Sequence, residues 1–356
     1  MKVGILTFHW ATNYGAVLQC YALQNYLESK GHEVKIINYK PARYDDNIYT
    51  FFHNRKFFHL SAYIHERKRE LALNKFRDMY LNQTERVYSW EKISPLASEF
   101  DAIISGSDQV TNPSFLLSGE GHAQVTPTYY LGFPFDGIRL GYALSFGCVT
   151  YPEVARSIAA DYIKNFNVVT VREKTGVQIV RSMGRDDAIV VPDPTLLMPA
   201  EFYVKLAHCA ELGLQYPYIY GFFIRHIKER KEAVNKILKG KKILWNNDDN
   251  IYSMESWLNK IKNAESVVTD SFHCVVMCLK LHIPFVVITE HNGNTGMNDR
   301  LYTLLEKCSL IELILHKSNI KNVPDVSAID INWNKVDYLL SAYSIVGKQI
   351  IGKYLN

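Results

Sequence analysis

The segment Val3-Gly4-Ile5-Leu6-Thr7 predicts a short buried strand, and the turn His9-Trp10-Ala11-Thr12-Asn13-Tyr14-Gly15 follows it. A helix is expected from about Ala16 to Lys30 with Gly31 as its C-cap, and Glu33 to Asn38 is the next expected strand. This strand–helix–strand unit has about the length that a right-handed parallel crossover requires. The start of the chain therefore favours a parallel α/β sheet.

The same alternation of strands and helices continues along the chain. Pro192-Asp193-Pro194 interrupts it, because two prolines stop regular structure, and we place a domain junction near Pro192 to Glu201. We expect an α/β protein with two Rossmann-like, doubly wound domains facing a cleft, residues 1–195 and 196–330, and a closing helix over residues 331–356. The expected strands lie at residues 100–108, 138–144, 168–172, 188–191, 218–223, 242–245, 266–269 and 284–288, and the expected helices at 174–183, 228–238, 256–264, 274–281, 300–307 and 333–354.

The composition is that of an ordinary globular protein. Of the 356 residues, 47% are hydrophobic and 21% are charged, which provides a core for each domain. The 40 Lys and Arg residues barely exceed the 36 Asp and Glu residues, and no basic stripe is present, so a nucleic-acid partner is not expected. The six cysteines follow no framework spacing, the start of the chain is unlike a signal peptide, and no apolar run could span a bilayer. We therefore expect a cytoplasmic protein.

A basic and aromatic segment runs from Tyr49 to Arg69. Two interpretations of it stay open. It forms either a solvated helix face or a surface for an anionic lipid or an acidic polymer. The second interpretation implies a peripheral contact with the inner face of the membrane.

Polar residues gather where the predicted strands end. The carboxyl ends of parallel strands meet at one edge of a sheet, and ligands bind there in doubly wound folds. One polar residue at such a place is usually a helix cap, but several turns on one edge point to a site. The candidates are His9, Asn13 and Gly15 in the first turn, Ser105 to Gln109 in the second, Ser145 to Gly147 in the third, Arg172 and Glu173 in the fourth, and Asp270 to His273 in the second domain.

The segment Thr269-Asp270-Ser271-Phe272-His273 places a histidine in the first turn of a predicted helix. Asp270 or Ser271 can cap this helix. The N–H groups at a helix start and the helix dipole favour an anion, so His273 suits a proton donor beside a negatively charged substrate. The alternative is a capped helix with an incidental histidine.

Three arginines could supply the fixed positive charge that an anionic ligand requires. Arg172 and Arg225 follow predicted strands, and Arg300 opens a predicted helix. Each can bind a phosphate or a carboxylate through two parallel hydrogen bonds, and each could instead form a surface ion pair.

Other signatures of enzyme families are missing. There is no GxGxxG after the first strand, no P-loop and no GxSxG elbow, which disfavours dinucleotide binding and ordinary kinase chemistry. Cys274 and Cys278 lie one helical turn apart among apolar residues, which indicates a buried helix face rather than a zinc site. No metal is expected.

An ordered set of motifs resembles the polysaccharide pyruvyl transferase family, from the first strand to about Leu310. The set as a whole is more specific than any one motif. The motifs are Thr7-Phe8-His9 with Asn13-Tyr14-Gly15-Ala16-Val17-Leu18-Gln19, Ser105-Gly106-Ser107-Asp108-Gln109-Val110, Tyr142-Ala143-Leu144-Ser145-Phe146-Gly147, Val171-Arg172-Glu173-Lys174-Thr175-Gly176, Asp193-Pro194-Thr195-Leu196-Leu197, Trp257-Leu258 with Ile261 and Ala264, Thr269-Asp270-Ser271-Phe272-His273, and Arg300.

The resemblance implies two domains like those of GT-B glycosyltransferases, with the acceptor on the first and the donor on the second. It implies transfer of pyruvate from phosphoenolpyruvate to a sugar of a polysaccharide or its precursor, as a ketal across two hydroxyls, without any cofactor. His273 matches the family's site histidine, and the chemistry makes it the general acid and Asp108 the base. We assign Arg172, Ser271, Arg225 and Arg300 to the donor, and His9, Asn13, Tyr14, Gly15, Ser107 and Gln109 to the acceptor or the cleft.

The chain departs from the family pattern at a few positions. Ser271 stands where some members carry an arginine, and Cys274 stands where glycine is common. Arg225 or Arg300 would then supply the charge at the donor. Two alternatives stay open: a GT-B-type glycosyltransferase that uses a nucleotide sugar, and a non-catalytic protein that binds a glycan or a metabolite. The sequence does not indicate the acceptor sugar or whether it is lipid-linked.

Overall fold

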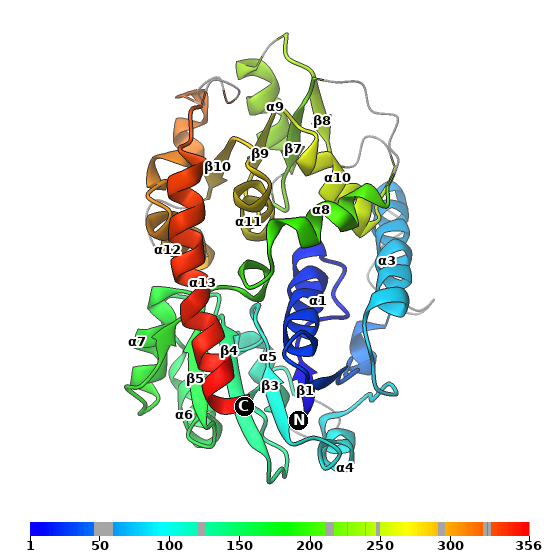
Figure 1. Cartoon of the computed structure of the whole chain (residues 1–356), viewed down its shortest axis with the longest axis vertical. Helices are drawn as coiled ribbons and strands as arrows, with labels where there is room; N and C mark the ends of the chain where they lie inside the picture. Colours follow the sequence, from blue (N-terminus) through cyan, green and yellow to red (C-terminus); the bar gives the residue numbers. More distant parts are fainter. Residues whose placement is uncertain are drawn as a thin grey trace. The chain divides into compact units, whose positions relative to one another are not determined.

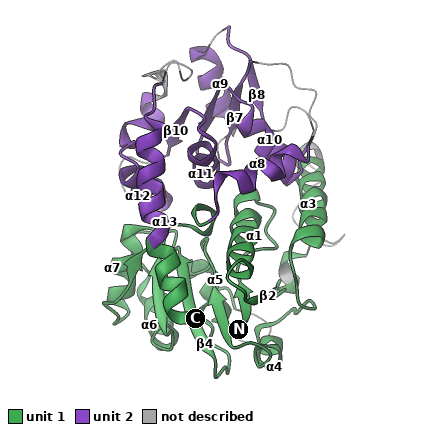
Figure 2. Cartoon of the chain, in the orientation of Figure 1, with its two compact units in different colours: residues 1–197, 346–356 green, residues 198–345 purple. Residues whose placement is uncertain are grey.

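The computed structural model describes residues 1–45, 60–119, 125–210, 217–225, 227–238, 240–246, 250–290, 296–322, 326 and 329–355. The chain divides into two compact units (Figure 2): unit 1 comprises residues 1–197 and 346–356, and unit 2 comprises residues 198–345. The division falls three residues after Pro192-Asp193-Pro194. Of the basic and aromatic segment, residues 49–59 lie outside the described residues, and the rest begins a long helix.

A parallel sheet forms the centre of unit 1 (Figure 1), and its strand order is β2-β1-β3-β4-β5-β6. Each pair of neighbouring strands is parallel, as the sequence predicts. The order reverses between β1 and β3, which is the switch point where doubly wound sheets bind ligands. The strands are β1 (Lys2–Leu6), β2 (Glu33–Ile36), β3 (Ala102–Ser105), β4 (Ile138–Leu144), β5 (Val168–Val171) and β6 (Ile189–Val190).

The first strand–helix–strand unit forms as predicted, with small shifts at the helix ends. α1 (Tyr14–Glu28) begins two residues early because Asn13 caps it. Asn13 Oδ1 accepts hydrogen bonds from the backbone N–H groups of Gly15 (2.8 Å) and Ala16 (3.2 Å). Gly31 ends the helix as predicted: it adopts φ +86°, its N–H donates to the carbonyl oxygen of Glu28 (2.9 Å), and the N–H of His32 donates to that of Leu27 (3.3 Å).

The remaining helices of unit 1 lie around this sheet (Figure 1). α1 packs against β2, against α3 and against the short 3₁₀ turn Pro194–Leu196. The amphipathic helix α6 was not predicted. The helices are α3 (Leu60–Tyr80), α4 (Ile93–Ala97), α5 (Pro113–Leu116), α6 (Glu153–Ile163) and α7 (Lys174–Ser182).

Unit 2 contains a second parallel sheet, with the strand order β11-β10-β9-β7-β8. Its pairs are again all parallel, so both units have the predicted Rossmann-like architecture. The helix α8 and the edge strand β11 were not predicted. The strands are β7 (Ile219–Phe222), β8 (Ile243–Trp245), β9 (Ser266–Thr269), β10 (Phe285–Thr289) and β11 (Ile314–His316), and the helices are α8 (Ala200–His208), α9 (Ile227–Ile237), α10 (Met254–Lys262), α11 (Phe272–Leu281) and α12 (Asp299–Lys307).

The predicted terminal helix is α13 (Trp333–Leu355), and it contributes to both units. Its last residues, from Val346 onward, belong to unit 1 (Figure 2). A Cβ at Gly347 would overlap the hydroxyl of Tyr142 on β4 and lie 3.0 Å from Pro192 Cγ. Only glycine therefore allows the helix to approach this part of unit 1 so closely.

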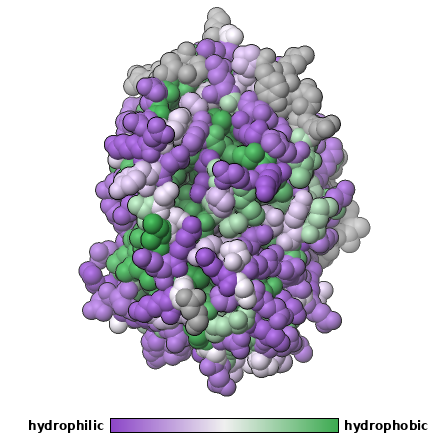
Figure 3. Space-filling view, viewed as in Figure 1, coloured by the Kyte–Doolittle hydropathy of each residue, from purple (hydrophilic) through white to green (hydrophobic). Residues whose placement is uncertain are grey.

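No helix in the described part of the chain is long and apolar enough to cross a membrane. On the face drawn in Figure 3, hydrophilic residues predominate, and the hydrophobic ones form interrupted patches.

Candidate active site

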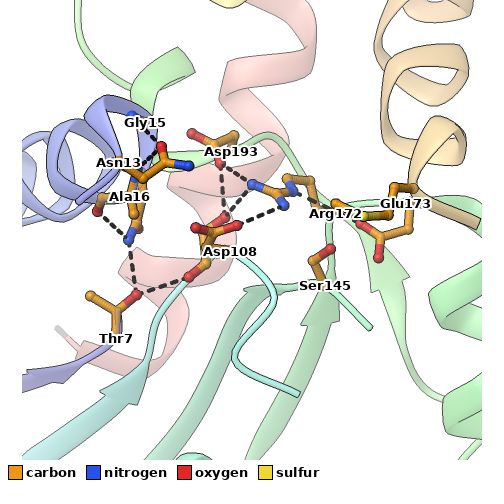
Figure 4. Close-up of polar contacts among 12 residues, drawn as sticks. Thr7, Asn13, Gly15, Ala16, Asp108, Ser145, Arg172, Glu173 and Asp193 are labelled. Atoms are coloured by element: carbon orange, nitrogen blue, oxygen red, sulfur yellow. Dashed lines mark hydrogen bonds and ion pairs between the residues drawn. The ribbon is translucent and has the colours of Figure 1, made fainter. Parts of the chain in front are cut away.

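A buried guanidinium lies at the centre of the polar residues in unit 1. Arg172 directly follows β5, and its side chain is 1% exposed. Its Nη1 lies 2.9 Å from Asp193 Oδ2, and its Nη2 lies 3.5 Å from Asp108 Oδ1 (Figure 4). Asp193 is also buried, whereas the Asp108 side chain is 15% exposed. Of the two carboxylates, Asp108 is therefore the more exposed to solvent.

Asp108 lies in a strained stretch of backbone after β3. Its φ is +77°, a region that residues with a Cβ seldom adopt. Its carbonyl oxygen accepts a hydrogen bond from the N–H of Ser145 (3.2 Å), at the end of β4, which fixes the loop to the neighbouring strand. Strain of this kind persists only where the surrounding structure maintains it, and it clusters at functional sites. The conformation aims Asp108 at Arg172 (Figure 4).

A chain of hydrogen bonds connects this loop to β1 and α1 across the switch point. Ser107 Oγ donates to Asp193 Oδ2 (2.8 Å), and Thr7 Oγ1 donates to the carbonyl oxygen of Ser107 (2.9 Å). Gln19 Nε2 donates to Thr7 Oγ1 (2.8 Å). Ser107, assigned to the acceptor, is fully buried and bonded within this network. Its contacts give it a role in positioning Asp193 and the loop.

The charge of Arg172 is balanced by protein carboxylates. Burial alone would lower the pKa of Arg172, but Asp193, Asp108 and Glu173 outweigh burial and raise it. Glu173 Oε1 also accepts a hydrogen bond from the N–H of Phe146 (2.9 Å). Arg172 was assigned to the donor. The structure places its guanidinium among carboxylates of unit 1, in contacts suited to holding Asp108 and Asp193.

His9 lies in the first turn and is 1% exposed. Its Nε2 is 3.1 Å from Asn38 Oδ1 and its Nδ1 is 3.2 Å from the carbonyl oxygen of Thr7. Burial lowers the pKa of His9 to about 4, since its two hydrogen bonds only partly offset the desolvation and the charges of Arg77 and Lys40 lower it further. The imidazole is therefore neutral at neutral pH.

This pKa predicts a pH-dependent stability. Between the unfolded value of 6.5 and the folded value of about 4, the unfolded state binds more protons, so stability falls as the pH falls. From about pH 7.5 to about pH 5, His9 should cost about 2 kcal/mol of unfolding free energy. Urea unfolding of the wild type and His9→Gln at both pH values tests this, because the contributions of other groups cancel in the difference. An equal pH dependence in both proteins would refute the assignment.

The other acceptor assignments lie at the start of α1 and beside β4. Asn13 is exposed and caps α1, while Tyr14 and Gly15 are buried in the first turn of that helix. Gln109 is half-buried and lies against Gly147, which has φ +67°. A Cβ on Gly147 would come within 2.8 Å of Gln109 Oε1, so the two positions depend on each other.

In unit 2, His273 lies in the first turn of α11, as predicted. Ser271 is the N-cap: its Oγ accepts from the N–H of Cys274 (3.4 Å), and its own N–H donates to Thr269 Oγ1 (3.0 Å). His273 is 6% exposed, and its ring is perpendicular to Phe272 with the centroids 5.2 Å apart. The cap and the ring contact hold the imidazole at the N-terminus of the helix.

Arg300, on α12, lies close to this helix start. Its Cζ is 5.8 Å from the centroid of the Phe272 ring, a cation–π contact. Phe272 thus contacts both His273 and Arg300. The structure brings together three of the four residues assigned to the acid and the donor in unit 2, namely His273, Ser271 and Arg300.

Arg225 differs from Arg300 because its side chain is exposed. Its backbone N–H and that of Ile224 donate to the carboxylate of Asp270 (3.1 and 2.7 Å), which fixes the loop after β7 to the loop after β9. Its guanidinium extends to the sulfur of Met297.

The sequence did not indicate Arg230, the buried partner of Asp270. Arg230 Nη1 lies 2.6 Å from Asp270 Oδ2, and its Nη2 lies 2.7 Å from Glu290 Oε2. Burial raises the pKa of Asp270 even against these hydrogen bonds and charges, so the carboxylate is strongly desolvated. Arg230 lies on the charged helix α9, forty residues before Asp270, and no local pattern distinguishes it from a surface arginine.

The sequence assignments therefore fall into two groups, one in each unit. Unit 1 holds Asp108 with Arg172, and unit 2 holds His273 with Ser271 and Arg300. No cluster of three or more potential metal ligands occurs among the described residues. Cys274 and Cys278 are buried on α11 and form no disulfide.

The motifs that carry these residues match a known family along most of the chain. The sequence model of the polysaccharide pyruvyl transferase family matches residues 13–292. The chain belongs to this family. Asp108, Arg172 and His273 all lie within the matched segment, as do Ser271 and Arg225. No curated protein matches the chain in sequence.

Solved structures show what fold this member of the polysaccharide pyruvyl transferase family has. A putative UDP-N-acetylglucosamine 2-epimerase from Listeria monocytogenes has a TM-score of 0.56 at 11% identity, covering 98% of this chain and 94% of its own. The S. aureus MnaA–UDP co-structure has a TM-score of 0.51 at 11% identity, with the same coverage of both chains. The likeness confirms the GT-B-like fold of two Rossmann-like domains.

Proposed function

We propose that this family member transfers pyruvate from phosphoenolpyruvate to a sugar of a polysaccharide or its precursor and forms a cyclic ketal. The family match supports a transferase that acts on polysaccharides. The observation that carries the finer proposal is the pairing of the accessible Asp108 with the buried Arg172 at the switch point of unit 1. A carboxylate fixed in this way suits a base that accepts a proton from a sugar hydroxyl.

The reaction balances in atoms and protons, and it needs no oxidant or reductant. A proton adds to the CH₂ carbon of the enol, and the carbon that bears the phosphate becomes an oxocarbenium-like centre. One sugar hydroxyl attacks this carbon and loses its proton. Cleavage of the C–O bond releases inorganic phosphate, and a second hydroxyl of the same sugar then closes the ketal. The two hydroxyl protons balance the proton taken up by the methyl group and the proton carried by phosphate.

Each step has a residue with suitable chemistry. His273, at the positive end of α11, would protonate the enol carbon, and the N-terminus of the helix would favour the phosphate and carboxylate of the donor. Arg300 and the exposed Arg225 would pair with these anionic groups. Asp108 would deprotonate the attacking hydroxyl. Arg172 would act through Asp108 as a positioning residue.

The proposal is tested by phosphate release from phosphoenolpyruvate with a panel of sugars, free and lipid-linked. Acceptor-dependent release, together with a product that carries a ketal methyl group by NMR, is the expected result. Hydrolysis or transfer from a uridine or guanosine diphosphate sugar, with no release from phosphoenolpyruvate, would favour the glycosyltransferase instead. Glycan binding without release from any donor would indicate a binding protein.

Asp108→Asn should reduce the rate of transfer by about 10²-fold or more, because the amide cannot take the hydroxyl proton. Asp101→Asn is the matched control, since Asp101 lies just before the same strand β3, is exposed, and bonds to the N–H of Lys2 (2.7 Å). The transfer rate of both variants is measured as the initial rate of phosphate release at saturating phosphoenolpyruvate. Equal rates in the two variants would show that Asp108 takes no part in the reaction.

A further inference from the structure

A polar cavity of about 340 Å³ lies in unit 1, beside the turn that follows β1. Side chains of the first turn, the segment after β2, α3 and the segment after α3 line it. Neither the family motifs nor the proposed chemistry uses these side chains, apart from His9. Among the lining residues are Trp10, Asn38, Asn74, Asp78 and Gln83.

Five of the lining residues form a row of alternating charge, here called the ion-pair belt. Arg86 Nη2 lies 2.7 Å from Asp45 Oδ1, and Asp45 Oδ1 lies 3.2 Å from Lys40 Nζ. Lys40 Nζ lies 3.9 Å from Glu70 Oε1, and Glu70 Oε2 lies 2.6 Å from Arg67 Nη1. The wall therefore presents donors and acceptors in alternation: three cations and two carboxylates, in which each cation has a carboxylate neighbour.

This alternation suits one class of ligand. A sugar hydroxyl both donates and accepts hydrogen bonds, so adjacent hydroxyls can bond to a carboxylate and to a neighbouring cation. The lining holds four cations, but a free anion would compete for Lys40, Arg67 and Arg86 with the carboxylates that already pair with them. An apolar ligand would leave the charged wall desolvated. The side chains of Asn38 and Gln83 add further donors and acceptors. The wall thus fits a neutral polyhydroxyl ligand.

The cavity and the Asp108 loop lie on two sides of the same turn. On one side, His9 Nε2 bonds to Asn38, which lines the cavity. On the other side, Thr7 Oγ1 donates to the carbonyl oxygen of Ser107, next to Asp108. Arg77 fixes the turn between them, because its guanidinium donates to the carbonyl oxygens of His9 and Ala11 (2.6 Å each).

We infer that this cavity is a subsite for a neutral sugar unit adjacent to the one that receives pyruvate, so that the acceptor is an oligosaccharide rather than a single sugar. The inference rests on the proposed function, which places the reacting sugar at Asp108. The adjoining unit extends past the first turn and bonds to the ion-pair belt. The enzyme then selects its acceptor by chain length as well as by the reacting sugar.

The test compares acceptors of one to five units from gluco- and galacto-oligosaccharide series in the wild type and in the double variant Asp78→Ala/Gln83→Ala. In the wild type, kcat/KM for transfer and affinity by titration calorimetry without donor should both rise from one unit to two or more. The double variant should reduce the ratio of kcat/KM for the longer acceptor to that for the single sugar by about tenfold. Asp161→Ala, an exposed acidic residue on α6 outside the cavity, should leave this ratio unchanged.

Three outcomes would overturn the subsite: affinity that does not depend on chain length, a ratio that is the same in the double variant, or displacement of bound oligosaccharide by inorganic phosphate or glucuronate. The last would make the cavity an anion site. Failure of the proposed function can be distinguished from failure of the subsite. Oligosaccharide binding that depends on Asp78 and Gln83, without phosphate release from phosphoenolpyruvate, would retain the subsite and reject pyruvyl transfer.

Discussion

His273→Ala should lower acceptor-dependent phosphate release from phosphoenolpyruvate by about 10²- to 10⁴-fold, the range that a positioned general acid contributes. The imidazole lies in the first turn of α11, held by the Ser271 cap and by the perpendicular ring of Phe272. Its loss leaves the enol carbon without a proton donor but keeps the helix N-terminus that favours the anionic donor. The fall should therefore appear in kcat more than in the KM for phosphoenolpyruvate.

The matched control is His282→Asn, at the other end of the same helix. His282 is the C-cap of α11 with φ +57°, a conformation that asparagine tolerates, and its Nε2 lies 2.9 Å from Asp337 Oδ1. This variant should retain the wild-type rate. His273→Gln, which nearly preserves side-chain volume, separates loss of the proton donor from loss of packing. A rate within about threefold of wild type for both His273 variants would contradict the general-acid assignment.

Arg172→Met should destabilise unit 1 by about 3–5 kcal/mol, the cost of removing one partner from a buried ion pair. Asp193 would stay fully buried without its counter-charge, and Glu173 and Asp108 would lose the same partner. The loop that holds Asp108 would lose its anchor, so transfer should fall together with stability. Urea unfolding followed by circular dichroism, with initial rates measured in parallel, gives both quantities.

Two further variants make this prediction specific. Arg156→Met removes a half-buried arginine that pairs with Glu153 on α6 and donates to the carbonyl oxygen of Ser182 (2.7 Å), and it should cost much less stability than Arg172→Met. Arg172→Met/Asp193→Asn removes the buried charge together with its closest partner. It should be more stable than Arg172→Met alone, because one uncompensated carboxylate is gone. Additive losses in the double variant would show that the pair is not coupled.

The sequence predicted most of the fold because strand and helix periods are local signals. β4 and β9 begin and end at the predicted residues, and α1 differs only at its ends because Asn13 caps the helix. The helices α6 and α8 escaped prediction. The extent of α13 across both units also escaped it, since membership of a unit depends on contacts distant in sequence.

The candidate site was predicted less completely, because its chemistry depends on partners that sequence spacing does not reveal. The position of His273 follows from a local rule about helix caps, and it is confirmed. Arg172 was recognised as a site arginine, but its pairing with Asp193, twenty-one residues later, could not be read from the sequence. The ion-pair belt was even harder to predict from the sequence, since Asp45 pairs with Arg86, which lies forty-one residues away.

The glycine at position 347 has a consequence for how the chain folds during synthesis. The ribosome releases residues 1–197 well before residues 346–356, yet both segments belong to unit 1. Ile351 and Leu355, near the end of the chain, are almost fully buried. Unit 1 can therefore complete its packing only after unit 2 has been synthesised. Until then, the end of α13 does not cover the surface around Tyr142 and Pro192.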